Sequence, residues 1–256
     1  MIDLHIHTNF SPDATDSIQD VLRVANSRGL RVVGISDHHD PGSKMPDMAY
    51  ISCMDDYVKS IVNMRGTYDL ELLVGLELGI QATVDEVPEN DFDYMIYSVH
   101  EVEDSYRIER LPDPWTSYLK ECLGALRPMP YPGFFGHLDF LRRYVEGHEP
   151  LHPSPLLDEV LRKIALVDMG IEINTSGWRH PFYEQNPQAW IIERFVELGG
   201  RYITVGSDAH SKDVVGEGID EALRLLNKLG IPEVFYCKHG NYVPLAVASL
   251  ILTTEV

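Results

Sequence analysis

Histidines and carboxylates recur along this 256-residue chain in a pattern that suits metal binding. Two pairs carry the clearest spacing, His5-Ile6-His7 near the start and Asp208-Ala209-His210 near the end. Side chains two residues apart in an extended segment point to the same side, so each pair can chelate one ion. The complete set of predicted metal ligands is His5, His7, Asp13, His38, Glu77, His100, His137, Asp208 and His210.

This predicted ligand set contains six imidazoles and three carboxylates and no thiolate. Nitrogen and oxygen donors of this kind suit zinc, manganese or iron, and nine of them are too many for one tetrahedral ion. We therefore expect two or three divalent metal ions. Three carboxylates neutralise only about half of the charge of three such ions, which leaves a positive pocket that attracts phosphate.

Short apolar, β-branched runs alternate with longer segments of helical period, which is typical of a parallel β/α architecture. The seven expected strands are 2–6, 32–36, 71–76, 94–99, 133–136, 170–173 and 202–205. The expected helices are 17–27, 47–64, 114–126, 155–168, 187–198 and 218–229. No flexible linker or internal repeat interrupts the series, so the sequence predicts one domain over residues 1–256.

The predicted ligands lie at or just after the ends of these expected strands, or in the loop that follows. The carboxyl ends of barrel strands converge on one rim, where barrel enzymes build their sites. A single histidine at such a position is usually an ordinary hydrogen-bonded residue. Six of the eleven histidines, however, lie at such strand-end positions. We put the odds that this arrangement is a coincidence at about one in ten or less. His39, beside these positions, is a candidate substrate-binding residue.

Two further segments have a predicted structure. Residues 127–132 are rich in proline and predict a connecting loop. Residues 234–236 and 242–247 predict an additional strand pair around a turn at 238–241, which would complete or cover an edge of the barrel.

Composition excludes several classes of protein. Lys and Arg total 21 against 40 Asp and Glu, and the resulting net charge of −19 disfavours binding to nucleic acid or to an anionic membrane. The three cysteines are too few and too scattered for a disulfide framework. No basic leader or long apolar run is present, so we expect an unprocessed cytoplasmic protein.

The strand-end segments resemble the motifs of the polymerase and histidinol phosphatase (PHP) superfamily. The similar segments are Asp3-Leu4-His5-Ile6-His7-Thr8 with Ser11 and Asp13, Ile35-Ser36-Asp37-His38, Gly75-Leu76-Glu77, Ser98-Val99-His100, Gly136-His137 and Gly206-Ser207-Asp208-Ala209-His210. Together they run across nearly the whole chain in the family's order. The resemblance implies a distorted (β/α)7 barrel of the PHP type, with a trinuclear metal centre that hydrolyses phosphoesters.

Residues 172–179, Glu-Ile-Asn-Thr-Ser-Gly-Trp-Arg, are similar to a segment of the histidinol-phosphate phosphatases of histidine biosynthesis. This likeness implies that Arg179 grips the substrate phosphate, with Asn174 and Ser176 as further substrate-binding residues. One position departs from the family, because Glu101 replaces the usual aromatic or apolar residue after His100. Glu101 pairs with a cationic substrate amine, or it indicates a different phosphomonoester.

The expected mechanism is metal-assisted hydrolysis, in which the ions lower the pKa of bound water to about 7 and supply hydroxide for in-line attack at phosphorus. Asp208, a nearby histidine or a metal-bound water would protonate the leaving alkoxide. Two alternatives remain open. One is a PHP phosphoesterase that acts on another phosphorylated metabolite or a nucleotide. The other is a non-catalytic, metal-stabilised interaction domain.

Overall fold

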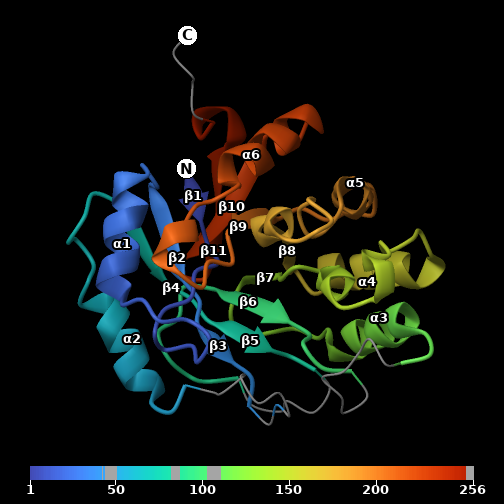
Figure 1. The fold of residues 1–256 in the computed structure, drawn as a ribbon, viewed down its shortest axis with the longest axis horizontal. Coiled ribbons are helices and arrows are strands. Elements are labelled where there is room, and N and C mark those ends of the chain that lie inside the picture. The colour runs from blue at the N-terminus through green and yellow to red at the C-terminus, as the bar shows by residue number, and fades with distance from the viewer. Residues whose placement is uncertain (42, 44–50, 82–86, 103–110, 252–256) are drawn as a thin grey trace.

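The computed structural model describes residues 1–41, 43, 51–81, 87–102 and 111–251. Parallel strands occupy the centre and helices surround them (Figure 1). The parallel strands are β1 (Ile2–Asp3), β2 (Val32–Ile35), β3 (His38–His39), β4 (Glu71–Val74), β5 (Glu77–Gly79), β6 (Met95–Ser98), β7 (Gly133–Phe135), β8 (Gly170–Asn174) and β9 (Ile203–Gly206). The α-helices are α1 (Ile18–Ser27), α2 (Met54–Val62), α3 (Pro114–Ala125), α4 (Pro155–Leu166), α5 (Ala189–Glu197) and α6 (Ile219–Lys228).

The parallel strands form two ladders, one in the order β1-β2-β4 and one in the order β3-β5-β6-β7-β8-β9. Isolated backbone contacts connect the first strand with the last, including a 3.1 Å hydrogen bond from Leu4 N to the carbonyl of Val205. A single parallel bridge between Ile6 and Ala209 lies beside it. The expected α/β class with a distorted strand ring is thus confirmed, although continuous ladders do not run around the whole ring.

The break between the two ladders has a specific cause in Tyr57 of α2. Its buried hydroxyl accepts a hydrogen bond from Asp37 N at 3.1 Å and lies 2.9 Å from the carbonyl of Gly75. These backbone groups are therefore satisfied by a side chain instead of a neighbouring strand. For this reason the expected strands 32–36 and 71–76 end early, and β3 and β5 start new pairings after them.

Gly34, beside this break, leaves space for the side chain of a second tyrosine, Tyr94. A Cβ atom added to Gly34 would lie 2.0 Å from the hydroxyl of Tyr94, which is fully buried and donates a 2.6 Å hydrogen bond to the carbonyl of Leu4. We expect Gly34→Ala to lower the free energy of unfolding by about 1–3 kcal/mol, measured by urea titration. Gly124→Ala is the control, since nothing lies within 4 Å of its Cβ position in α3. It should be neutral or stabilising by up to about 1 kcal/mol, and equal stabilities for the two variants would contradict the packing described.

Polar side chains define where the helices begin. The Ser17 side chain accepts a hydrogen bond from Asp20 N at 3.2 Å before α1, and Ser154 accepts one from Leu157 N at 3.1 Å before α4. Such caps satisfy amides that have no partner within the helix. The expected helix 47–64 needs correction: α2 starts at Met54, residues 51–53 are not helical, and 47–50 lie outside the described residues.

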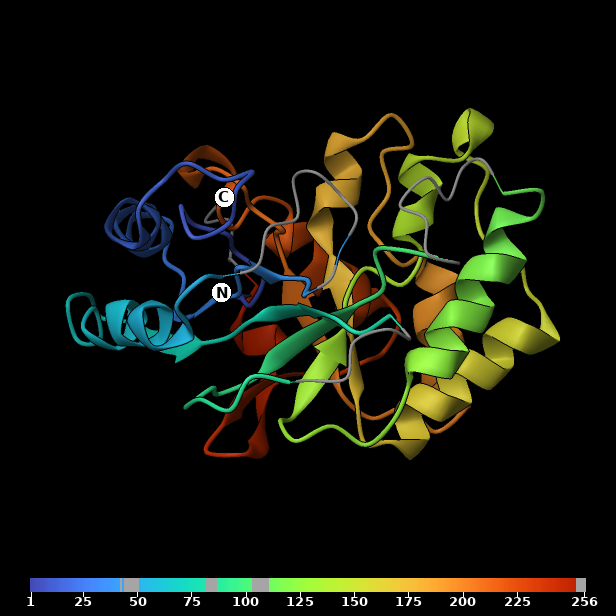
Figure 2. The ribbon, with the colours of Figure 1, turned by 90° about the horizontal axis from the view of Figure 1, so that it is seen from below.

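The additional strand pair is present as an antiparallel hairpin of β10 (Glu233–Lys238) and β11 (Asn241–Ala246), drawn in red at the lower edge of Figure 2. The Tyr242 hydroxyl lies 2.8 Å from the carbonyl of Gly133, the first residue of β7, and accepts a 3.1 Å hydrogen bond from its amide. The hairpin therefore covers the amino ends of the strands and leaves their carboxyl ends free. The segment 127–132 forms a loop without helix or strand, as predicted.

Buried apolar side chains from the strands and from the inner faces of the helices form one core cluster. In α1 these are Ile18, Val21, Leu22 and Ala25, at the spacing of a helix packed on a sheet. Among the described residues, no helix has the length and apolar character required to span a membrane.

Candidate metal centre

The carboxyl ends of the parallel strands bring the nine predicted ligands together, and we call these nine residues the donor cluster. His38 and Glu77 start β3 and β5, while the others follow β1, β6, β7 and β9. Within the described residues, three groups have ligand atoms that all lie within 4.8 Å of one another. These groups are His5, His7 and Glu77; His7, His38 and His210; and His38, Glu77 and His100.

Glu77 lies at the centre of the donor cluster and is fully buried. Its two carboxylate oxygens approach five imidazoles. The nearest nitrogen–oxygen distances are 3.2 Å to His5, 3.5 Å to His7, 2.8 Å to His38, 3.2 Å to His100 and 2.9 Å to His137. One side chain thus connects the donors of four different strands, as a carboxylate shared between cations does.

The two aspartates lie at the edge of the same cluster. Asp13 Oδ2 is 3.1 Å from His210 Nε2 and 3.6 Å from His38 Nε2. Asp208 Oδ1 is 3.4 Å from His7 Nε2 and 3.5 Å from His210 Nδ1. The structure therefore places every predicted metal ligand within contact distance of another one.

Several of these atoms have no hydrogen-bond partner among the described residues. They are His5 Nε2, His7 Nε2, His38 Nδ1 and Glu77 Oε2, all of them buried. Buried polar atoms almost always have a partner, and here the short contacts lack hydrogen-bond geometry. Divalent cations would satisfy all four atoms, so the donor set fits a metal centre.

The charges of the cluster suit cation binding. Burial by itself would raise the pKa of Glu77, but the neighbouring His38 and His5 outweigh this effect. The net pKa of Glu77 lies well below its usual value, so the carboxylate is ionised. Burial, together with His210 and His38, lowers the pKa of His7 well below 6.5. The neutral ring of His7 therefore has a lone pair available for a metal ion.

Two carboxylates behind the donor cluster were not among the predicted site residues. Glu172 Oε1 lies 2.7 Å from His5 Nδ1, and its Oε2 accepts a 3.0 Å hydrogen bond from His137 N. Asp40 Oδ1 lies 3.0 Å from His100 Nδ1. Carboxylates at the far nitrogen of an imidazole fix its orientation and tautomer for metal binding. The sequence signal that could have identified Glu172 was the presence of a glutamate inside an otherwise apolar strand.

We expect Glu172→Gln to weaken zinc binding by about 10–100-fold, because a neutral amide orients the His5 ring less strongly than a carboxylate. Competition with a chromophoric chelator measures the zinc affinity. Glu159→Gln, on the exposed side of α4, is the control because it removes the same charge far from the site. Zinc affinity unchanged by the Glu172 substitution would contradict the positioning role.

An arginine that was not among the predicted site residues lies beside Asp208 of the donor cluster. Arg143 Nη2 donates hydrogen bonds to Ser176 Oγ at 2.6 Å and to Asp208 Oδ2 at 3.2 Å. Its Nε is buried and has no partner among the described residues. The only signal in the sequence was a basic residue shortly after His137 in an acidic chain.

The predicted phosphate-binding residue Arg179 also contacts Asp208, at its backbone carbonyl. Its Nη2 donates to the carbonyls of Ser207 at 2.7 Å and Asp208 at 3.1 Å. Its Nη1 is buried without a partner within the described part of the chain. Arg143 and Arg179 thus each retain N–H capacity beside Asp208, as an oxyanion site requires.

The remaining predicted substrate residues have distinct positions. Asn174 is fully buried and joins Glu172 to Ser176, accepting a 3.1 Å hydrogen bond from Ser176 N. His39 follows His38 in β3 and is not a member of the three donor groups. Glu101 is buried directly after His100 and accepts a hydrogen bond from the Ser43 hydroxyl.

Residues 3–176, more than half of the chain, match the model of the PHP domain family. The chain therefore belongs to this family, as the strand-end motifs indicated. It is 28% identical over 229 residues to the probable histidinol-phosphatase of Thermotoga maritima, covering 89% of this chain and 92% of that protein. It is 27% identical over 255 residues to the histidinol-phosphatase of Lactococcus lactis subsp. lactis, covering 91% and 93% of the two chains.

A solved structure supports the same relationship. The crystal structure of histidinol phosphate phosphatase from Lactococcus lactis subsp. lactis, in complex with zinc, L-histidinol and phosphate, superimposes with a TM-score of 0.81 at 26% identity. The match covers 94% of this chain and 98% of that one. The fold of this chain thus corresponds to that of a solved histidinol phosphate phosphatase.

Proposed function

We propose that this chain is a metal-dependent phosphomonoester hydrolase that converts L-histidinol phosphate to L-histidinol and phosphate in histidine biosynthesis. The observation that carries the proposal is the convergence of the nine donors beside two arginines. The likeness to the Lactococcus enzyme, which binds zinc, L-histidinol and phosphate, supports it.

The donor cluster would hold two or three divalent ions, with zinc as the first choice and manganese or iron as the other candidates. We assign the nine donors as their ligands, in a trinuclear arrangement if each of the three donor groups holds one ion. When bound, such ions polarise phosphoryl oxygens and lower the pKa of coordinated water. The Glu172 and Asp40 carboxylates hold the ligand rings in place.

The two arginines would receive the phosphoryl group. A guanidinium fork matches phosphate oxygens, and the unpartnered Arg143 Nε and Arg179 Nη1 are free to donate to them. Ser176 Oγ, within hydrogen-bond distance of both Arg143 and Asp208, would keep these two groups in position. Fixed positive charge would then meet the charge that develops on the phosphoryl oxygens.

Asp208 remains the proposed catalytic carboxylate. Although its burial favours the neutral form, His5, His7, His210 and Arg143 hold its pKa well below the usual value. The ionised Asp208 carboxylate would bind a cation, take up the proton of an attacking water and pass that proton to the leaving alkoxide.

Glu101 would pair with the ammonium group of the substrate. It is a buried acid immediately after His100, and burial strengthens an ion pair with a ligand cation. Asn174, Ser176 and His39 complete the proposed substrate-binding set. We propose a cytoplasmic enzyme with a small phosphorylated metabolite as its partner and no nucleic acid, in keeping with the net charge of −19 and three free cysteines.

The test is phosphate release by zinc- or manganese-loaded protein from L-histidinol phosphate, p-nitrophenyl phosphate and a panel of sugar and nucleoside monophosphates. We expect kcat/KM for L-histidinol phosphate to exceed the others by at least about 100-fold, with loss of activity in chelator. Preference for another phosphomonoester would reassign the substrate. No turnover of any phosphomonoester would overturn the enzymatic function.

We expect Arg179→Ala to raise KM and to lower kcat/KM by about 10–1,000-fold while the metal content stays unchanged, because the lost contact is to phosphate and not to metal. Steady-state kinetics and metal analysis of the same preparation check this. Loss of metal together with activity would assign Arg179 a structural role in holding the Asp208 loop.

A further inference from the structure

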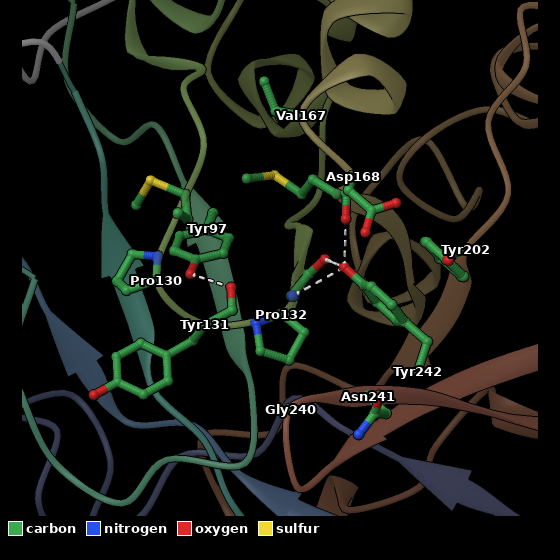
Figure 3. Close-up of a pocket in the computed structure, with 13 residues that line it drawn as sticks. Tyr97, Pro130, Tyr131, Pro132, Val167, Asp168, Tyr202, Gly240, Asn241 and Tyr242 are labelled. Atoms are coloured by element: carbon green, nitrogen blue, oxygen red, sulfur yellow. Dashed lines mark hydrogen bonds between the residues drawn. The ribbon is translucent and has the colours of Figure 1, made fainter.

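A second concave site lies at the opposite end of the barrel from the donor cluster. It is a cavity of about 440 Å³, within the usual size range of small-molecule sites. The residues around it lie at the amino ends of β7, β8 and β9 and on the β10–β11 hairpin (Figure 3). Because the donor cluster lies at the carboxyl ends of the same strands, the cavity is not part of the proposed active site.

The polar groups of the cavity are mostly acceptors. Asp168 is the only lining residue, among those described, with a formal charge at neutral pH. Its carboxylate forms no hydrogen bond or ion pair with another described residue, and its side chain is exposed. Pro130 and Pro132 contribute no amide donors, and the Tyr97 hydroxyl already donates to the carbonyl of Tyr131 at 2.9 Å. A ligand that donates hydrogen bonds or carries positive charge therefore matches the cavity.

One wall of the cavity is aromatic and rigid. The rings of Tyr202 and Tyr242 are stacked with centroids 3.7 Å apart and planes 7° apart. The Tyr242 hydroxyl contacts the carbonyl of Gly133. It also contacts the carbonyl of Asp168 at 2.9 Å, as a dashed line in Figure 3 shows. Burial chiefly raises the pKa of Tyr242, so its hydroxyl stays protonated. Arg201 lies 5.6 Å from the Tyr202 ring centroid but does not line the cavity.

We propose that this cavity is a second binding site, which takes a small organic monocation such as a protonated aromatic amine. The apolar body of the ligand packs against the tyrosine wall, and its ammonium group pairs with Asp168. Aromatic faces and a carboxylate both attract such a cation, whereas a phosphate monoester would be repelled. The site thus differs in ligand class from the phosphate-binding mouth of the barrel.

Calorimetric titration with benzylammonium tests the proposal, using zinc-loaded protein saturated with inorganic phosphate so that the donor cluster is blocked. We expect saturable binding with about one site per chain, and at least about tenfold weaker binding of the neutral analogue benzyl alcohol. No saturation up to about 10 mM benzylammonium would overturn the proposal. Binding that appears only when phosphate is omitted would overturn it as well, because the amine would then occupy the donor cluster.

Asp168→Asn identifies the cavity as the place of binding. Asp168 has φ +59°, a conformation that asparagine also adopts readily, so the substitution changes charge and little else. We expect benzylammonium to bind at least about tenfold more weakly, while Glu159→Gln on the exposed side of α4 binds it as wild type does. Equal affinity of Asp168→Asn and wild type would contradict the proposal. If Asp168→Asn is too unstable to titrate, benzylammonium is titrated into the wild-type protein at increasing salt concentrations instead. The affinity should fall as salt rises, and binding that does not depend on salt would contradict the ion pair.

Discussion

Glu77→Gln should reduce kcat/KM by at least about 1,000-fold, equivalent to about 4 kcal/mol of transition-state stabilisation, and should lower the metal content of the purified protein. Glu77 is the only carboxylate of the donor cluster that approaches five imidazoles, and it belongs to two of the three donor groups. The amide keeps the shape of the side chain but removes its charge. Neighbouring cations would then lose the negative charge and one of the two oxygens that they share.

Elemental analysis and phosphate-release kinetics on one preparation check this result. Glu159→Gln is the matched control, because the same change on the exposed side of α4 should leave metal content and kcat/KM at wild-type values. A Glu77→Gln protein with full metal content and activity within about tenfold of wild type would contradict the central role of this carboxylate.

Arg143→Lys should lower kcat/KM by about 100–1,000-fold without loss of metal. The guanidinium spans Ser176 and Asp208 and still has a buried, unpartnered Nε, whereas an ammonium group is a compact point charge without the fork. Charge that develops on the phosphoryl group would lose a fixed donor, so kcat should fall along with kcat/KM.

The neighbouring Arg142→Lys is the control for Arg143→Lys. Arg142 Nη1 lies 2.5 Å from Glu184 Oε2, and its guanidinium lies 4.5 Å from the ring centroid of Phe182, so these contacts do not involve Asp208. We expect its kcat/KM to stay within about threefold of wild type. If Arg143→Lys loses metal, or if both lysine variants are equally impaired, Arg143 does not act on the phosphate.

The β/α architecture was predictable from sequence because its signals are local. Helices such as α1 and α4 show both an apolar face of helical period and a serine cap, and the strands are short apolar runs between them. The split of the expected strands 32–36 and 71–76 was not predictable. It depends on the Tyr57 hydroxyl, which reaches the strands from α2 and has no counterpart in a periodic pattern.

The convergence of the donor cluster was predictable to the extent that its members follow strand ends, since topology alone brings such positions to one rim. Glu172 and Arg143 act through tertiary contacts, and no spacing identifies them. The backbone geometry was not predictable from the sequence either. His137 and Asp208 have φ values of +26° and +52°, which non-glycine residues rarely adopt. Such conformations are typical of positions where the surrounding structure fixes a functional side chain.

Anomalous X-ray diffraction at the zinc absorption edge, from crystals grown with zinc and phosphate, tests the metal centre most directly. We expect zinc peaks among the three donor groups around Glu77, with phosphate between them and the arginines Arg143 and Arg179. Crystals that show no zinc among these side chains, or zinc bound only at another place on the protein, would contradict the account.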